Sequence, residues 1–563
     1  MTATAMLCHL AENIGRAAKC NHVTPSNLTL SIFERQAAFG PGFPHSDRVI
    51  MPYHVTNMCA MDMGILPSDP EDFQKWARRN YRSLVKQFPD LSPYFSSPEI
   101  DGKPCRHYPR AIMGEYLKAR FRDGVEAARK MGMRVDLYPE CEVIDLKELH
   151  DTIQISVKRL ASGSVFIRNA HRVLLATGHW FDSSWQGGYC PSPWPAQNLT
   201  RRIPKDQHVA VIGSSLSAIE VVLTLTSEGR YERLDNGRLV YLPPPHPRHV
   251  TLYSRRGLLP RVRGKIGNRQ NLYFTQKGLE DMREGRNGRL DLENLFRLLD
   301  RELAAAYGKK VDWHDLATSS GNGEAFLQNA ISVARHGDNP DGEVIWQTVL
   351  YRILPMAREI FLNLTTADRK RFEREYSTLF FSHAATQPVI NAEKLLALMK
   401  ARLVKVQPLG RSYRLLKDDI KDRYWFIYRD SNGKEKRKPY RFVVNARGQE
   451  KSYQFNRSEL AQNLIGSGTV QLEETHDPSE PFLLKGNSGS VEPPLPYRTG
   501  SIWVDPKTHQ IMKKTPEGRI DRSKGIYAVG AMTRGQFIDA SMAMGSVRST
   551  AVIAKEWVEP ISK

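Results

Sequence analysis

A short turn rich in glycine and serine, between an apolar strand and an apolar helix, is the clearest candidate for chemistry in this sequence. The strand, Val209 to Ile212, runs into Gly213-Ser214-Ser215-Leu216-Ser217-Ala218. A dinucleotide-binding turn needs a tight bend at Gly213, a small residue at Ser215 where backbone approaches a pyrophosphate, and a small Ala218 where helix packs on strand. The amides of the helix N-terminus, with the Ser214 and Ser217 positions, then face the phosphates. A strand–helix corner that binds no ligand is the alternative.

Two consecutive arginines follow the next strand. His249 to Tyr253 ends in Ser254-Arg255-Arg256-Gly257, where the ribose of an adenine nucleotide lies in a dinucleotide-binding fold. Guanidinium groups at this place suit a 2′-phosphate, so Arg255 and Arg256 favour NADP over NAD. An exposed basic turn is the alternative.

A second, partial copy of the same pattern stands at the N-terminus. The strand from Leu28 to Phe33 ends at Glu34, a position from which a carboxylate binds the hydroxyls of a ribose. Apolar residues at helical spacing predict an amphipathic helix over residues 3–19, before this strand. A first strand and glycine turn normally precede such a helix, and we expect about 10 to 15 residues carrying them to lie upstream of Met1.

Three further apolar strands end near glycines and complete the pattern. Val173 to Gly178 closes the first block, Phe442 to Gly448 closes the second, and Gly525 to Gly530 precedes a helix predicted from Ser541 to Val558. Between residues 268 and 385 the sequence predicts an inserted helical segment. Its aromatic and basic side chains are candidates for a substrate pocket, with packing as the alternative: Trp346, Arg352, Arg358 and the nearby His383.

Charge and length limit the class of protein. The 563 residues suggest roughly three or four domains, and 81 Lys and Arg against 61 Asp and Glu give a net charge of +20 that attracts anions. The basic residues form no nucleic-acid-binding motif, so no nucleic-acid partner is expected. No apolar run approaches the roughly 18 residues of a membrane span and no signal peptide is evident. We therefore expect a cytoplasmic protein with a small-molecule substrate and no membrane partner.

The cysteines are widely spaced. They stand at positions 8, 20, 59, 105, 141 and 190, at least 12 residues apart. This spacing contains no C-x-x-C pair and no paired metal ligands. Thiol–disulfide chemistry and a metal site are therefore not expected.

Two polar side chains outside these turns are further candidates. Arg110 is a candidate for binding a phosphate or an acidic substrate, with a surface ion pair as the alternative. Asn57 is the second candidate for a binding role, and a turn-forming asparagine is the alternative. His9, His54 and His179 have no partner in the sequence and are interpreted as packing or surface residues.

Eight ordered segments together resemble a known family. They are LSIFERQAAFGPGF, YHVTNMCAMDMG, PRAIMGEYLKARF, VLLATGHW, VAVIGSSLSAIE, LYSRRGLLPR, FVVNARGQ and IYAVGAMTRG. The set resembles the FAD/NAD(P)-binding proteins grouped with flavin-dependent urate hydroxylases and aspartate N-monooxygenases, and more distantly ornithine and lysine N-hydroxylases and flavin-containing monooxygenases. The resemblance covers roughly residues 2–555.

The resemblance implies an α/β fold with two Rossmann-like dinucleotide-binding domains, nested as in glutathione reductase, and a helical insertion. FAD would be bound by residues 1–200 and 451–563, and NADPH by residues 205–450, which include the insertion at about 268–385. By the same resemblance, Glu34 binds the FAD ribose and Asn57 lies beside the flavin. The expected cofactor-binding set also includes Gly178, Gly530, Arg534 and Gly535.

The activity implied is that of an FAD- and NADPH-dependent monooxygenase that hydroxylates a small polar metabolite through a hydroperoxyflavin. The sequence departs from the pattern in lacking the FAD glycine turn, in having Ala531 where many flavoproteins have an aspartate, and in lacking an F-x-G-x-x-x-H signature after Gly178. An NAD(P)H–flavin oxidase or dehydrogenase without oxygen insertion, and a nucleotide-binding protein without turnover, remain alternatives. No catalytic residue is assigned.

Overall fold

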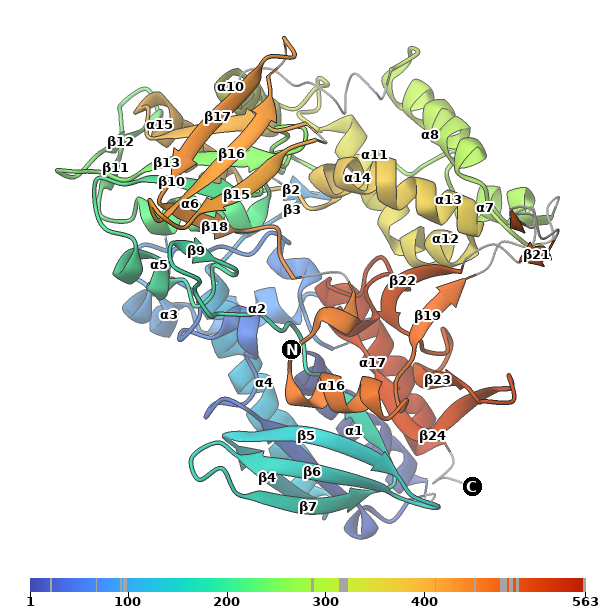
Figure 1. Ribbon diagram of the computed structural model, residues 1–563. Helices are drawn as coiled ribbons and strands as arrows, with labels where there is room; N and C mark the ends of the chain where they lie inside the picture. Colours follow the sequence, from blue (N-terminus) through green and yellow to red (C-terminus); the bar gives the residue numbers. More distant parts are fainter. Residues whose placement is uncertain are drawn as a thin grey trace.

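The two ends of the sequence share one half of the molecule. The computed structural model describes residues 1–559 apart from 21–22, 67, 92–93, 95–98, 285–287, 313–322, 411, 431, 450–451, 476–482, 486–489 and 493–495. In Figure 1 the N-terminal segment (blue to cyan) and the C-terminal segment (red) form the lower half, and the middle of the chain (green to orange) forms the upper half. The half formed by the two ends contains Glu34, and the other half contains the Gly213 turn.

Two parallel pairings organise the lower half. β1 (Thr29–Glu34) pairs in parallel with β4 (Arg134–Pro139). β24 (Ile520–Ala528) pairs in parallel with β8 (Val173–Leu175) and antiparallel with β23 (Gln510–Lys514). These are the apolar segments that the sequence analysis interpreted as strands.

Three helices cover these strands from one side. α1 (Thr2–Lys19) packs against α4 (Arg110–Lys130) and α17 (Ala543–Val558), and the apolar faces of all three helices meet side chains of β1, β4, β8 and β24 in one core. The helices predicted over 3–19 and 541–558 are thereby confirmed. Within the described ranges no ladder joins β1 to β8 or β24. The first strand expected upstream stays a prediction.

A five-stranded parallel sheet forms the centre of the upper half. Its order is β14 (Val404–Pro408), β13 (His249–Ser254), β10 (His208–Ile212), β18 (Phe442–Asn445) and β9 (Tyr189–Cys190). The chain leaves β10 toward β13 on one side, while β18 pairs on the other side. Ligands bind where the strand order reverses in this way. The expected α/β fold with parallel sheets and added helices is confirmed.

Helices pack on this sheet to form the second core. α6 (Leu216–Leu225), α10 (Gly323–His336) and α15 (Val389–Lys400) contribute apolar side chains to it. β9 joins this sheet although it precedes residue 200, and α5 (Gln197–Arg202) also packs here through Leu199. The boundaries proposed for the two domains stay predictions.

Most helices of the insertion lie above the C-terminal elements in Figure 1, whereas α10 lies beside the parallel sheet. The members of the insertion are α7 (Gln276–Glu284), α8 (Leu292–Tyr307), α10, α11 (Ile345–Ile353), α12 (Ala357–Asn363), α13 (Thr366–Arg371), a π-helical turn (Phe372–Tyr376) and α14 (Ser377–Ala384). The predicted helical character is confirmed. Between residues 345 and 384 the insertion consists of several short helices rather than long ones.

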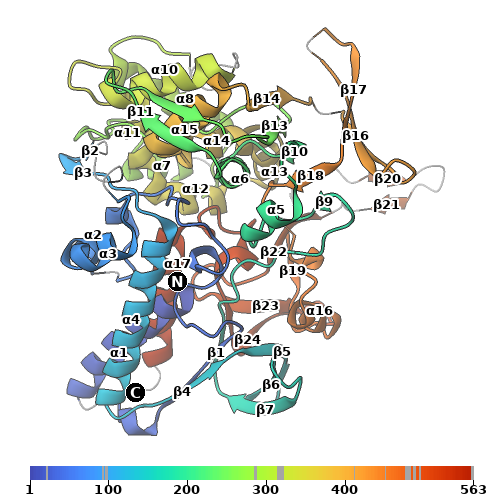
Figure 2. The same ribbon diagram turned by 90° about the vertical axis from the view of Figure 1, so that its left-hand side faces the viewer.

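Smaller antiparallel elements surround the two halves (Figure 2). Two antiparallel three-stranded sheets are β5 (Cys141–Glu148), β6 (Ile153–Arg159) and β7 (Val165–Ala170), and β15 (Arg414–Asp418), β16 (Arg423–Arg429) and β17 (Glu435–Tyr440). Antiparallel pairs are β2 (Glu99–Ile100) with β3 (Lys103–Pro104), β11 (Arg230–Arg233) with β12 (Leu239–Leu242), β19 (Leu472–Thr475) with β22 (Tyr497–Ile502), and β20 (Leu483–Lys485) with β21 (Ser490–Glu492). Further α-helices among the described residues are α2 (Asp72–Arg79), α3 (Tyr81–Gln87) and α16 (Glu459–Gly466). No helix in the described ranges is both long enough and apolar enough to span a membrane.

Candidate functional site

The carboxyl end of β1 lies beside the beginning of α1. Glu34 is half-buried at this end, and its Oε1 accepts a hydrogen bond from the Gln36 amide at 3.0 Å. Burial raises the pKa of the Glu34 carboxyl group above its ordinary value. The Met1 amino nitrogen donates to the Gly40 carbonyl at 2.9 Å, so α1 begins at this strand end. The Glu34 carboxylate and the first turn of α1 are therefore neighbours, as a dinucleotide corner requires.

The C-terminal loop reaches the same place from the other side. Gly530 has φ +81°, and a Cβ there would lie 3.9 Å from Oγ1 of Thr2 in the first turn of α1. Gly178 has φ +69° with no neighbouring atom within 4 Å of a Cβ position. Gly535 has φ +119°, and its Cβ position lies 2.5 Å from the Thr499 carbonyl oxygen. The structure thus brings Gly530 to the start of α1, and Gly178 and Gly535 each adopt a conformation that favours glycine.

The second corner has the geometry that its sequence predicts. Gly213 has φ +124°, and a Cβ there would lie 2.9 Å from the carbonyl oxygen of Ala446, just beyond β18. Ser215 is the exposed N-cap of α6 and makes no side-chain capping bond, while Ala218 is fully buried against the sheet. The turn therefore lies where β10 and β18 end together, at the reversal of strand order, with an uncapped helix N-terminus.

The two serines that flank this turn differ in environment. Ser214 is buried, and its Oγ hydrogen-bonds to Ser254 Oγ at 2.8 Å, which links the turn to the end of β13. Ser217 is half-buried in the first turn of α6. Ser214 therefore stabilises the corner through its hydrogen bond to the end of β13, and phosphate binding by its hydroxyl stays a prediction.

Arg255 and Arg256 are exposed just after β13, but each contacts the insertion. Arg255 Nη2 donates to Thr378 Oγ1 at 3.0 Å, and Arg256 Nη2 donates to the Glu375 carbonyl at 3.2 Å. Neither hydrogen bond involves a carboxylate. Both guanidinium groups keep their charge available for an anion, and their contact with a 2′-phosphate stays a prediction.

Arg110 joins the two halves of the protein. Its Nη1 donates to both carboxylate oxygens of Glu220 on α6 at 2.8 Å, and the two side chains are 18% and 8% exposed. Its guanidinium group also lies over the Trp194 ring, 5.6 Å from the centroid. The ion pair foreseen as the alternative is present, and it is largely buried rather than on the surface. Phosphate binding by Arg110 stays a prediction.

The segments that follow β8 and β18 meet between the two corners. His179 Nδ1 donates to Gln449 Oε1 at 2.9 Å, and the Trp180 amide donates to the same oxygen at 3.2 Å. Burial lowers the pKa of the His179 imidazole, and the nearby charge of Arg534 adds to this effect. Partial burial also lowers the pKa of Arg534, while the Glu373 carboxylate acts in the opposite direction. The Arg534 guanidinium group makes no hydrogen bond to another residue in the described part of the chain, so a half-buried cation faces this junction.

Two buried arginines tie the insertion to the C-terminal segment. Arg358 Nε donates to the Asp539 carboxylate at 2.8 Å, and both side chains are 12% exposed. Arg369 Nη2 donates to the Gly535 carbonyl at 2.7 Å and to Glu473 at 3.3 Å. Arg358 and Arg369 thus fix the insertion over the loop that contains Gly530 and Arg534.

The other substrate-pocket candidates are engaged in contacts of their own. Arg352 pairs with Asp101, and Trp346 packs edge-on against His383 at 4.6 Å between ring centroids. Of the histidines interpreted as packing residues, His9 and His54 are buried.

Two of the widely spaced cysteines do form a disulfide, although their spacing had indicated no thiol–disulfide chemistry. Cys59 and Cys105 form a disulfide across 46 residues of sequence, with a Cα–Cα distance of 5.0 Å. Backbone bonds from Ala60 to Arg106 (2.8 Å) and from Thr56 to Tyr108 (2.9 Å) align the two loops. Local spacing in a sequence carries no information about such a pairing. Asn57 lies half-buried in the first of these loops, and its contact with a flavin stays a prediction.

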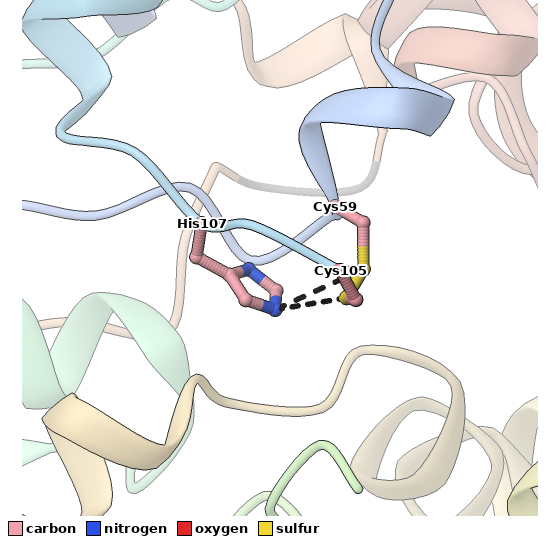
Figure 3. Close-up of side chains that lie close together, drawn as sticks. All are labelled: Cys59, Cys105 and His107. Atoms are coloured by element: carbon pink, nitrogen blue, oxygen red, sulfur yellow. Dashed lines mark hydrogen bonds between the residues drawn. A yellow bond between two sulfur atoms is a disulfide. The ribbon is translucent and has the colours of Figure 1, made fainter. Parts of the chain in front are cut away.

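His107 lies against this disulfide. Its Nδ1 donates to the Thr56 carbonyl at 3.0 Å, while its Nε2 lies 3.5 Å from Cys105 Sγ and 3.9 Å from Cys59 Sγ (Figure 3). Burial lowers the pKa of His107 to about 4, and Arg263 adds to this effect. The ring is therefore neutral at pH 7.

These residues fit the two nucleotides expected from the sequence. A carboxylate at the end of β1 suits a ribose, and open or positive-φ glycines allow backbone to approach a cofactor. The uncapped N-terminus of α6 suits a pyrophosphate, and Arg534 supplies a half-buried positive charge between the corners. Both sites are assembled from ends of parallel strands, which is where α/β sheets bind ligands.

Comparisons with known proteins agree with this description. Residues 1–180 match the family model described as FAD-NAD(P)-binding. The uncharacterized protein YdhS of Escherichia coli (strain K12) is 24% identical over 413 residues, which cover 69% of this chain and 73% of YdhS. The expected resemblance to FAD/NAD(P)-binding proteins is confirmed by the family model for this N-terminal region.

Some of the solved structures that this chain matches are ornithine hydroxylases and a lysine monooxygenase. The ornithine hydroxylase PvdA of Pseudomonas aeruginosa has a TM-score of 0.49 at 10% identity, with 99% of this chain and 97% of that chain covered. The ornithine N-hydroxylase KtzI of Kutzneria sp. 744 has a TM-score of 0.44 at 12% identity, with 99% and 96% covered. L-lysine 6-monooxygenase from Pseudomonas syringae has a TM-score of 0.42 at 11% identity, with 100% and 98% covered.

Proposed function

We propose that this protein is an FAD- and NADPH-dependent oxidoreductase, and specifically a monooxygenase that hydroxylates a small polar metabolite. One observation carries the proposal, which is that the two corners face a common junction. The Arg110–Glu220 ion pair joins the half that contains the Glu34 corner to the half that contains the Gly213 corner. The segments that follow β8 and β18 then meet through the hydrogen bond between His179 and Gln449. Two nucleotides bound at such corners direct their reactive rings toward a shared junction. The family model over residues 1–180 supports the nucleotide assignment.

The residues of the two corners would bind the two nucleotides. Glu34 would hold the FAD ribose, and the glycines at 178, 530 and 535 would let backbone approach the cofactor. The Gly213–Ala218 turn would hold the NADPH pyrophosphate, with Arg255 and Arg256 on its 2′-phosphate. When bound, FAD supplies hydride acceptance from NADPH and the activation of O₂, which no side chain of the protein provides.

The insertion would exclude water and complete the substrate pocket. The buried pairs of Arg358 and Arg369 place it over the Gly530–Gly535 loop. A water-excluding cover suits oxygen chemistry because it prevents loss of reactive intermediates. Arg534, a half-buried cation that makes no hydrogen bond among the described residues, is a group suited to hold an anionic portion of cofactor or substrate.

The experiment begins with the absorbance spectrum of the purified protein, expressed from Met1 and also with any upstream coding sequence. A flavin spectrum that bleaches on addition of NADPH supports the flavoenzyme. Coupling of NADPH consumption to a hydroxylated product supports the monooxygenase. Consumption that yields hydrogen peroxide alone with every tested metabolite identifies an NAD(P)H–flavin oxidase. A protein that stays colourless with added FAD in both forms refutes the redox function and leaves a nucleotide-binding protein.

We place the reaction in the cytoplasm as part of the same proposal, because NADPH is a cytoplasmic reductant. The buried Cys59–Cys105 disulfide is unusual there, since the thiol pools of that compartment keep most cysteines reduced. Fractionation of cells that express a tagged protein tests this placement. Recovery in a membrane or extracytoplasmic fraction contradicts it.

A further inference from the structure

Three side chains that bind soft metal ions lie together beneath the helical insertion. Cys59, Cys105 and His107 are 2%, 0% and 4% exposed, and their possible ligand atoms all lie within 4.8 Å of one another. Figure 3 shows that the imidazole and both sulfur atoms face one point. This cluster has no part in the nucleotide corners described above.

The imidazole of His107 is oriented as in a metal ligand. A carbonyl oxygen can only accept, so the Nδ1 atom that contacts Thr56 O at 3.0 Å carries the ring's hydrogen. In the neutral ring Nε2 then presents its lone pair to the two sulfurs. A disulfide offers that lone pair no hydrogen, whereas a metal ion bound by two thiolates fits it. Histidines that bind metals characteristically donate their other N–H to a carbonyl or carboxylate.

Of the three distances between the possible ligand atoms, the two N···S distances agree with tetrahedral coordination. Bond lengths of about 2.1 Å for Zn–N and 2.3 Å for Zn–S give an N···S separation of about 3.6 Å in a tetrahedral centre. The observed Nε2–Sγ separations are 3.5 Å for Cys105 and 3.9 Å for Cys59. After reduction only the two sulfurs have to separate, to about 3.8 Å by the same geometry. Rotation of the two cysteine side chains accommodates this change while the backbone bonds between the loops persist.

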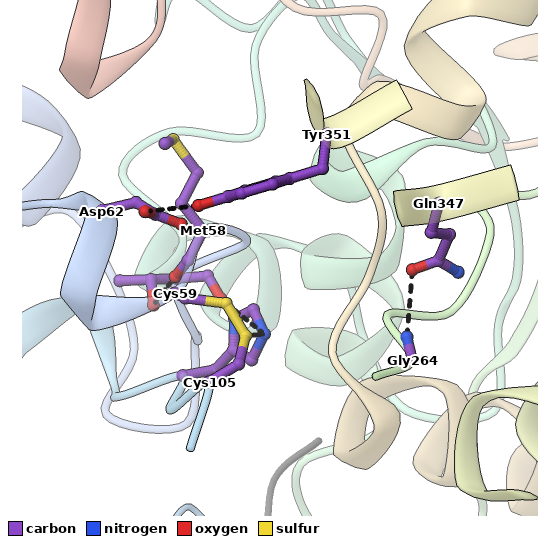
Figure 4. Close-up of a disulfide and its surroundings, with 9 residues drawn as sticks. Met58, Cys59, Asp62, Cys105, Gly264, Gln347 and Tyr351 are labelled. Atoms are coloured by element: carbon purple, nitrogen blue, oxygen red, sulfur yellow. Dashed lines mark hydrogen bonds between the residues drawn. A yellow bond between two sulfur atoms is a disulfide. The ribbon is translucent and has the colours of Figure 1, made fainter. Parts of the chain in front are cut away.

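The surroundings hold the cluster in place from both halves of the protein. Tyr351 of α11 packs against it and donates from its hydroxyl to Asp62 Oδ1 at 3.0 Å, and the Gly264 amide donates to Gln347 Oε1 nearby at 3.1 Å (Figure 4). Two thiolates cancel the charge of a divalent ion, so the buried guanidinium group of Arg263 faces a neutral centre.

We propose that the reduced form of this cluster is a metal site in which Cys59, Cys105 and His107 bind one thiophilic divalent cation of the Zn²⁺ type, with a fourth position left for water. The disulfide and the metal site are two mutually exclusive states of the same side chains. Reduction by a thiol converts the disulfide and two external thiols into two cysteine thiols and one external disulfide. Binding of Zn²⁺ then releases the two cysteine protons.

Zinc stoichiometry of the purified full-length protein tests the proposal. The protein is treated with a chelator and divided, and one portion is reduced with a phosphine and desalted without oxygen. Both portions receive Zn²⁺, are desalted again and are analysed for metal by mass spectrometry. We expect about one zinc per chain in the reduced portion beyond that in the oxidised portion, and protection of two thiols from a thiol reagent.

Substitutions locate the ion. Cys59→Ser and His107→Ala should lose the additional zinc, and Cys190→Ser, a buried thiol elsewhere in the protein, should keep it. In the Co²⁺-loaded protein a thiolate-to-metal charge-transfer band should appear and be absent from Cys59→Ser. The comparison of oxidised and reduced wild-type protein needs no variant to fold. Equal zinc in the two portions, while the reduced portion exposes two more titratable thiols, overturns the proposal, as does full zinc binding by Cys59→Ser.

Discussion

Two properties of Gly213 require a glycine at the corner that we assign to NADPH, its backbone conformation and the close contact at its Cβ position. Substitution by alanine tests both. At φ +124° an alanine costs about 1–3 kcal/mol of backbone strain. Its Cβ would also lie 2.9 Å from the Ala446 carbonyl oxygen, and overpacking against backbone adds about 1–3 kcal/mol. Gly237 is the matched control, because its φ is +75° and nothing lies within 4 Å of its Cβ position. Gly237→Ala should cost about 1 kcal/mol.

These magnitudes predict different behaviour in two assays. For a domain the size of residues 205–450, each kcal/mol of lost stability lowers the temperature of the unfolding midpoint by about 2–4 °C. Gly213→Ala should therefore lower the midpoint by about 10 °C and Gly237→Ala by about 3 °C. Relief of the clash moves the turn away from β18, so we expect the NADPH dissociation constant, followed by nucleotide fluorescence, to rise at least about tenfold, which corresponds to 1.4 kcal/mol. FAD content should stay constant. Wild-type NADPH affinity in Gly213→Ala would refute the assignment of this turn to the nucleotide.

Three further outcomes follow from individual side chains. The double change Arg255→Ala with Arg256→Ala should raise KM for NADPH much more than KM for NADH, and equal changes in steady-state assays would exclude contact with a 2′-phosphate. Arg358→Met leaves the buried Asp539 with only the longer contact to Arg548 at 3.9 Å, and should lower the free energy of unfolding by up to about 3–5 kcal/mol. Arg519→Met, at an exposed pair, should cost less than about 1 kcal/mol, and similar denaturant midpoints for both variants would show that the insertion is not held by Arg358. Burial lowers the pKa of His54 to about 4, so below pH 6.5 the unfolded chain binds a proton that the folded chain excludes. As the pH falls from 6.5 to 4, the free energy of unfolding should decrease by up to about 1.4 kcal/mol per pH unit. His54→Gln should reduce this pH dependence in thermal unfolding, and an unchanged dependence contradicts a role for His54.

Local patterns predicted the strand–turn–helix corners because their requirements are local. An apolar strand followed by Gly213 and Ser215 can be recognised within ten residues, and the structure places both where two strands end together. Glu34 was recognised in the same way, from its position directly after a strand. Periodicity also predicted α1, which buries one face as far as Ile14.

Contacts between distant segments could not be predicted in this way. Arg110 and Glu220 are 110 residues apart, and nothing near Arg110 in the sequence indicates a partner on α6. Cys59 and Cys105 meet because their loops exchange backbone hydrogen bonds, a property of the tertiary fold. β9 joins the second sheet through only two residues, which is too short for a periodic signal.

The arginines of this protein show why net charge alone left the function undecided. Arg110, Arg358 and Arg369 each have a buried carboxylate within 3.3 Å, so their charges are used to hold the halves and the insertion together. Arg534 differs, because its half-buried guanidinium group makes no hydrogen bond among the described residues, and Glu373 acts on it only electrostatically. A cation in that condition is suited to bind an anionic ligand. Since Arg358 and Arg369 fix the insertion over the same loop, an anion bound by Arg534 would lie beside the insertion. The position of this cation and the packing of the insertion therefore point to the same place as the strand ends.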